Sequence, residues 1–182
     1  MTRTTRALAV YLVALLAGCA TGSPNLPTQA GVDLQKYAGT WYEQARLPNR
    51  FQSDCVGEVR ADYKVLADNS IRVTNQCRAK SGQTKVAEGE GRMAQGVTPG
   101  DPSKLEVRFA PEWMSWLPLV WGDYWILRLE GDYQYSLVGT PDREYLWVLS
   151  RSPQADPRVA DALLDYAGTL GFPVGQVTKS GN

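Results

Sequence analysis

The sequence is built largely from short segments in which apolar and polar residues alternate, with turn residues between them. In one of these segments, Leu105, Val107 and Phe109 alternate with charged residues. A period of two places the apolar side chains on one face of a half-buried β-strand. Eight such strands are predicted, at Thr40–Leu47, Val56–Leu66, Ile71–Ala79, Thr84–Met93, Lys104–Phe109, Gly122–Glu130, Tyr133–Gly139 and Glu144–Arg151.

The pattern changes once, near the C-terminus. Pro157–Leu170 carries an apolar stripe at helical spacing, Asp156 is a suitable N-cap, and Gly171 can end the helix. Val174–Thr178 is expected to form a short final strand. Because strands and helices do not alternate along the chain, we predict an all-β fold: an eight-stranded antiparallel up-and-down barrel with a C-terminal α-helix packed outside. A β-sandwich is the alternative arrangement.

The N-terminus has the features of an export signal. Arg3 and Arg6 precede eleven apolar residues, Ala7–Ala17, whereas a membrane-spanning helix needs about 20. The sequence Leu-Ala-Gly-Cys that ends at Cys19 resembles the bacterial lipoprotein signal, in which small residues are followed by a lipid-bearing cysteine. The resemblance implies that residues 1–18 are removed and that Cys19 is lipidated. An ordinary signal peptide with an incidental cysteine is the alternative.

The residue after the cysteine bears on location, since an Asp there resembles an inner-membrane retention signal. Ala20 stands at this position, which favours the outer membrane of a Gram-negative bacterium, with the protein anchored by lipid and facing the periplasm. Residues 19–30, rich in Thr, Ser and Pro, are expected to form a flexible tether. The barrel domain is then expected over residues 31–182.

The remaining cysteines, Cys55 and Cys77, form an even pair in an oxidising compartment. A disulfide between them is predicted, and two free thiols are the alternative. The chain contains no histidine, which removes Ser-His and Cys-His catalytic arrangements and makes a metal site improbable on two cysteines alone. With 19 basic and 19 acidic residues, the chain has no electrostatic footprint for nucleic acid.

Three motifs fall in order on the predicted elements. Gly39–Trp41 opens the first strand, Gly131–Tyr133 lies between the sixth and seventh, and Leu149–Arg151 ends the eighth. Together they resemble the motifs of the lipocalin family, over about residues 31–180. The closest resemblance is to the bacterial outer-membrane lipoprotein lipocalins, whose eighth strand is similar to Tyr145–Arg151. The middle motif usually begins with Thr, so Gly131 is a departure.

The resemblance implies roles for two residues in structural closure of the barrel. Trp41 is expected to close its floor, and Arg151 to lie across the indole in a cation–π contact of about 1–2 kcal/mol. If Arg151 points inward, then Trp147 does so as well, because side chains alternate along a strand.

The candidate ligand contacts are aromatic. An eight-stranded barrel leaves space for side chains or one small ligand, and the resemblance implies a fatty acid or a lysophospholipid. The sixth strand is apolar on both faces, so alternation does not decide whether Tyr124 or Trp125 points inward. Ordinary core packing is the alternative for each candidate. The residues expected to contact the ligand are Tyr63, Trp121, Tyr124 and Trp147.

The segment Ala110–Trp125 is unusually apolar for a loop. Exposed apolar patches usually mark contact surfaces, and Trp is enriched at membrane interfaces. We therefore expect a ligand portal, a lipid-surface contact or both, with a lid folded onto the protein as the alternative.

These features predict a non-catalytic protein without cofactors that binds a small apolar ligand for storage or transport in the cell envelope. An acyl chain of about 15 methylenes gives about 12 kcal/mol of transfer free energy. Ordering costs several kcal/mol, which leaves a micromolar or tighter site. Two alternatives remain: a lipid-modifying enzyme with Glu43 as acid or base, and an envelope scaffold that binds a protein through the apolar loop. No oligomeric state is predicted.

Overall fold

The computed structural model describes residues 26–95 and 100–180. The predicted signal peptide and Cys19 lie outside the described residues. Within the described ranges, no helix is both long and apolar enough to cross a membrane.

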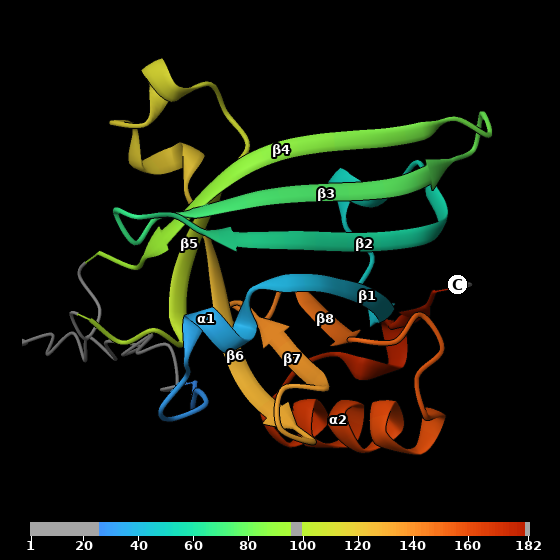
Figure 1. The fold of residues 1–182 in the computed structure, drawn as a ribbon. Coiled ribbons are helices and arrows are strands. Elements are labelled where there is room, and N and C mark those ends of the chain that lie inside the picture. Colours follow the sequence, from blue (N-terminus) through green and yellow to red (C-terminus); the bar gives the residue numbers. More distant parts are fainter. Residues whose placement is uncertain (1–25, 96–99, 181–182) are drawn as a thin grey trace, which may run out of the picture.

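The described chain forms a closed antiparallel barrel (Figure 1). Each strand from β2 to β8 pairs with the next, β8 pairs with β1, and the pairing of β1 with β2 closes the wall. The predicted up-and-down barrel is confirmed, and the eight strand positions are correct to within two residues. The strands are β1 (Gly39–Arg46), β2 (Cys55–Val65), β3 (Ile71–Ala79), β4 (Thr84–Met93), β5 (Lys104–Arg108), β6 (Gly122–Glu130), β7 (Tyr135–Gly139), β8 (Leu146–Ser150) and β9 (Thr178–Lys179).

The wall buries a different apolar cluster on each of its faces. The outer cluster packs under α2 (Pro157–Thr169), the predicted C-terminal helix, and includes Trp125 and Leu163. The inner cluster includes Trp41 and Tyr124. Strand β6 contributes to both clusters, which explains why its sequence is apolar at every position in its centre and why alternation alone does not assign Tyr124 and Trp125.

Two local predictions differ from the structure. A short helix, α1 (Leu34–Tyr37), precedes β1 and was not predicted; the side chain of Asp33 caps it by accepting from two backbone N–H groups. The short final strand predicted at Val174–Thr178 is present but begins only at Thr178, because Val174–Gln176 forms a 3-10 turn after Pro173. Strand β9 pairs with β1 at Ala45 and Arg46, beyond the residues of β1 that pair with β2.

The packed part of the chain also begins earlier than the predicted boundary at residue 31. The side chain of Leu26 is buried in the outer cluster. The backbone N–H of Gln29 donates to the carbonyl of Ile126, and the hydroxyls of Thr28 and Ser103 are hydrogen bonded at 2.8 Å. These contacts hold residues 26–30 against the barrel, where a flexible tether was expected.

One end of the barrel is flared. Strand β1 pairs with β2 only from Gly39 to Tyr42, and β4 pairs with β5 only from Glu90 to Met93. Strands β2, β3 and β4 therefore extend beyond the closed part of the wall as a three-stranded arm (Figure 1). Within this arm, a disulfide joins Cys55 at the start of β2 to Cys77 on β3.

Removal of this disulfide is expected to destabilise the fold by about 3 kcal/mol, because it releases a closed loop in the unfolded chain. Urea denaturation of the C55A/C77A variant and of the native chain measures the change. The reduced native chain is the control and is expected to match the variant. Equal denaturation midpoints for the oxidised and reduced chains would contradict the prediction.

Candidate ligand-binding site

The closed end of the barrel is sealed by one residue from each of the three sequence motifs. The indole of Trp41 is fully buried, and the guanidinium carbon of Arg151 lies 3.9 Å from its ring centroid. The side chain of Arg151 also donates hydrogen bonds to the carbonyl oxygens of Lys36, Tyr37, Thr40 and Tyr133. A charged group in this position is stabilised by both the ring face and the backbone oxygens.

Glycine is required beside this contact. Gly39 has a φ of +100°, and a Cβ there would lie 3.2 Å from Nη1 of Arg151. Only glycine adopts this backbone conformation readily and leaves the guanidinium room to lie over Trp41. The middle motif contributes the hydroxyl of Tyr133, which accepts a hydrogen bond from the N–H of Asp33 at 2.7 Å and fixes the start of α1.

Above the floor, four hydroxyl groups form a hydrogen-bonded chain. Tyr63 and Tyr124 are 2.9 Å apart at their oxygens, Tyr124 and Tyr37 are also 2.9 Å apart, and Tyr37 lies 3.0 Å from the oxygen of Ser136. Burial raises the pKa of Tyr37 to about 12 and raises the pKa of Tyr63 and Tyr124 as well. The chain therefore presents neutral phenols to the interior at physiological pH.

The cavity beside this chain is small. The centre of a water-sized sphere has about 10 Å³ in which to move, which is room for about one water molecule. A ligand with a long acyl chain therefore finds no preformed pocket at the floor. It has to bind at the flared end or displace side chains. The lining residues include Leu34, Tyr63, Ile71, Leu105, Val107 and Tyr124.

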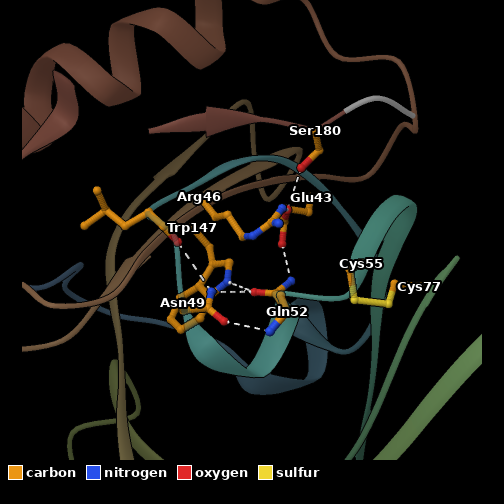
Figure 2. Close-up of polar contacts among 9 residues, drawn as sticks. Glu43, Arg46, Asn49, Gln52, Cys55, Cys77, Trp147 and Ser180 are labelled. Carbon is orange, nitrogen blue, oxygen red and sulfur yellow. Dashed lines mark hydrogen bonds and ion pairs between the residues drawn. A yellow bond between two sulfur atoms is a disulfide. The ribbon is translucent and has the colours of Figure 1, made fainter. Parts of the chain in front are cut away.

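The flared end carries a row of aromatic rings. Trp147 points toward the interior from β8, as strand alternation predicts, and its ring stacks at 5.9 Å on that of Tyr145. Tyr145 in turn lies 5.9 Å from Phe51, which is 61% exposed in the loop between β1 and β2. The indole N–H of Trp147 donates to the side-chain oxygen of Gln52 at 2.9 Å (Figure 2).

A buried ion pair lies behind these rings. Glu43 is only 2% exposed, and it accepts hydrogen bonds from Arg46 and Gln52, each at 2.6 Å, and from the hydroxyl of Ser180 (Figure 2). Three donors hold this carboxylate in place. These hydrogen bonds connect the loop between β1 and β2, and the C-terminal segment, to β1. This is a structural role for Glu43. The enzyme alternative assigned the same residue to proton transfer.

The sequence analysis did not place Arg46 or Gln52 in this site. The register between β1 and β8 shifts between Glu43 and Ala45, so that Glu43 pairs with Leu149 while Arg46 pairs with Trp147. This bulge lets Glu43 and Arg46 point to the same side although strict alternation places them on opposite faces. No feature of the sequence predicted this shift in the register between β1 and β8.

Of the four predicted ligand contacts, the structure places three in the barrel interior. Tyr63 and Tyr124 line the floor cavity, and Trp147 lies at the flared end. Trp121 lies elsewhere, because Arg92 and Arg108 lie 3.8 and 5.2 Å from the centre of its ring. On β4 and β5 these two arginines alternate with Gly91, Leu105 and Val107, which line the interior cavity. It is therefore not part of the interior wall.

A closed eight-stranded barrel with this floor is the architecture of lipocalins. The sequence model of the family described as a lipocalin-like domain matches residues 32–181, and the chain belongs to the lipocalin family. The solved structure of insecticyanin from the tobacco hornworm Manduca sexta has a similar fold, with a TM-score of 0.67, 21% identity, and coverage of 87% of this chain and 85% of that chain.

Relatives come from plants and bacteria. Temperature-induced lipocalin-1 of Arabidopsis thaliana is 35% identical over 161 residues, which cover 88% of this chain and 84% of the relative. Outer membrane lipoprotein Blc of Escherichia coli (strain K12) is 31% identical over 163 residues, which cover 88% and 86%. Blc of Vibrio cholerae is 31% identical, with 90% and 92% covered. These comparisons confirm the predicted lipocalin family and the predicted similarity of this chain to bacterial outer-membrane lipoprotein lipocalins.

The buried phenols predict how stability depends on alkaline pH. An unfolded tyrosine ionises near pH 10.0, whereas Tyr37 in the folded chain resists ionisation to about pH 12. The stability that it contributes is therefore complete below pH 10 and is lost as the pH rises through about 12. Phenolate absorbance during a titration is expected to show exposed tyrosines ionising first and the buried ones only with unfolding. Ionisation of all tyrosines in a single early step would contradict this.

Proposed function

We propose that this lipocalin binds one fatty acid, lysophospholipid or similar small apolar molecule in its barrel, without catalysing a reaction, for storage or transport in the cell envelope. The observation that carries the proposal is the flared end, where the aromatic row of Phe51, Tyr145 and Trp147 leads toward an apolar interior. Aromatic and aliphatic linings with a few polar groups are typical of small-molecule sites.

The polarity of the interior favours one orientation of the ligand. The phenols near the floor are neutral, and the charges of Glu43 and Arg46 are directed at each other. Arg151 at the floor donates to backbone carbonyls, and no residue that lines the floor cavity is positively charged, so a carboxylate or phosphate moved there would lose its hydration without a cation in the cavity wall. The acyl chain therefore enters first, and the charged headgroup remains at the flared end in contact with water.

The small floor cavity limits how far such a chain penetrates. Tyr37 packs on Trp41, and Tyr63 and Tyr124 line the small cavity beside it. The proposed site therefore lies mainly between the aromatic row and these two phenols. Deeper binding requires their rings to move, which costs the hydroxyl hydrogen bonds between them.

The location is part of the proposal. Residues 1–18 serve as a lipoprotein signal, lipid on Cys19 anchors the protein, and it faces the periplasm from the outer membrane. The sequence around Cys19 supports this location, and so do the relatives that carry the name outer membrane lipoprotein. Acyl chains on one cysteine provide a stable anchor because each buried methylene contributes about 0.8 kcal/mol.

Replacement of Trp147 is expected to weaken ligand binding. The W147A variant loses apolar contact area at the flared end, and a loss of about 1.4 kcal/mol corresponds to about tenfold weaker binding. Displacement of a fluorescent fatty acid measures the affinity, and native mass spectrometry identifies a retained lipid. The control is Y166A on the outer helix, expected to bind normally. Absence of any lipid or displacement in the native chain would refute the proposal.

Replacement of Cys19 is expected to release the protein from the membrane. When the full chain is expressed in a Gram-negative host fed with labelled palmitate, the native chain is expected to take up label and to sediment with outer membranes. The C19S variant is expected to do neither. The C55A/C77A variant is the control, since its remaining cysteine is Cys19. Equal labelling of C19S and the native chain would exclude this anchor.

A further inference from the structure

The loop between β5 and β6 presents a concentrated apolar surface. We call residues 110–121 the tryptophan loop. Trp113 is 74% exposed, Trp116 is 75% exposed and Leu119 is 98% exposed. Glu112 is the only charged residue in the loop. Large apolar side chains gathered in this way on a protein surface mark a contact surface.

We infer that the tryptophan loop inserts into the interfacial region of a lipid bilayer and forms a second membrane attachment beside the lipid on Cys19. The inference rests on the proposed anchor for the position of the membrane. Binding of a ligand in the barrel does not by itself require this contact between the loop and a bilayer.

The loop is folded in a way that suits insertion. It contains two 3-10 turns, Glu112–Met114 and Pro118–Val120. Five of its backbone N–H groups donate to carbonyl oxygens three residues earlier, all within the loop. In a bilayer an unpaired backbone group costs several kcal/mol, so each internal pair lowers the cost of entry. The donor and acceptor pairs are Met114–Pro111, Ser115–Glu112, Leu117–Met114, Val120–Leu117 and Trp121–Pro118.

The base of the loop is fixed to the barrel. Arg92 and Arg108 both make cation–π contacts with Trp121, and its indole N–H donates to the carbonyl of Ser115 at 2.8 Å. Arg108 also donates to the carbonyl of Ala110 at 2.9 Å and is paired with Glu90. These contacts hold both ends of the loop, which lies above the barrel in Figure 1, while the side chains of Trp113 and Trp116 are exposed.

The length of the tether places a bilayer within reach. Six residues lie between Cys19 and the packed Leu26, so the two Cα atoms are at most about 25 Å apart when the chain is extended. An anchored barrel therefore stays close to the membrane surface. In Figure 1 the first described residues lie at the lower left of the molecule and the tryptophan loop lies at its upper left, so both are on the left side of this view.

The composition of the loop favours lipid over a protein partner. Protein interfaces surround an apolar centre with a polar rim that supplies hydrogen bonds. The exposed side chains of this loop instead include two tryptophans, whose rings combine an apolar body with an N–H group and accumulate at the level of lipid headgroups.

The test uses the chain from residue 19 onward with C19S, so that no lipid anchor contributes. Sedimentation with vesicles of phosphatidylethanolamine and phosphatidylglycerol measures partitioning. The W113S/W116S variant is expected to partition at least about tenfold more weakly. W113F/W116F is expected to retain most of the binding, and V86S, which changes an exposed apolar residue on β4, is expected to bind normally.

Each result bears on the inference. Equal partitioning of W113S/W116S and the C19S chain would overturn it, and so would a failure of the C19S chain to bind vesicles at all. Loss of a crosslinked envelope protein from W113S/W116S without loss of vesicle binding would assign the loop to a protein partner instead.

Fatty-acid displacement is expected to be unchanged in W113S/W116S, so a failure of the ligand proposal is recognised separately. Quenching of Trp fluorescence by brominated lipid in the unmutated loop provides a measurement that does not depend on a variant.

Discussion

The contact between Trp41 and Arg151 is the constraint on which the rest of the barrel depends. It joins the first strand to the residue that follows the last one, and through backbone carbonyls it also holds α1 and the turn between β6 and β7. A closed sheet has no free edge to adjust, so fixing its first and last strands sets the register of those between them. The three motifs are far apart in sequence because they meet only at this floor.

The interior changes in character from the floor to the flared end. Near the floor, tyrosine rings and their hydroxyl chain fill the space almost completely. At the other end, the pairing of β1 with β2 and of β4 with β5 stops early, and aromatic rings line the opening. Side-chain packing at one end thus supplies stability, and incomplete strand pairing at the other supplies access for a ligand.

The two proposed attachments to a membrane would give the proposed function a physical setting. A lipid on Cys19 would limit the distance of the barrel from the bilayer, and the tryptophan loop would limit its orientation. An apolar ligand is sparingly soluble in water, so a carrier held at the surface shortens the path on which the ligand is exposed. The aromatic row and the loop remain separate features, because Trp121 faces Arg92 and Arg108 outside the barrel.

The sequence by itself determined the strands, the barrel, the C-terminal helix and the residues of the floor, because alternation with a period of two and three short motifs are local signals. It also indicated Tyr63 and Trp147 as interior residues, whereas the structure decided between Tyr124 and Trp125. Only the tertiary structure decided the inward placement of Arg46 beside Glu43, the position of Trp121, the packing of Leu26 and the near-filled floor. Each of these features depends on a bulge, on a contact between segments distant in sequence, or on the total volume of the side chains at the floor. None of them produces a periodic pattern of residues from which it could be predicted.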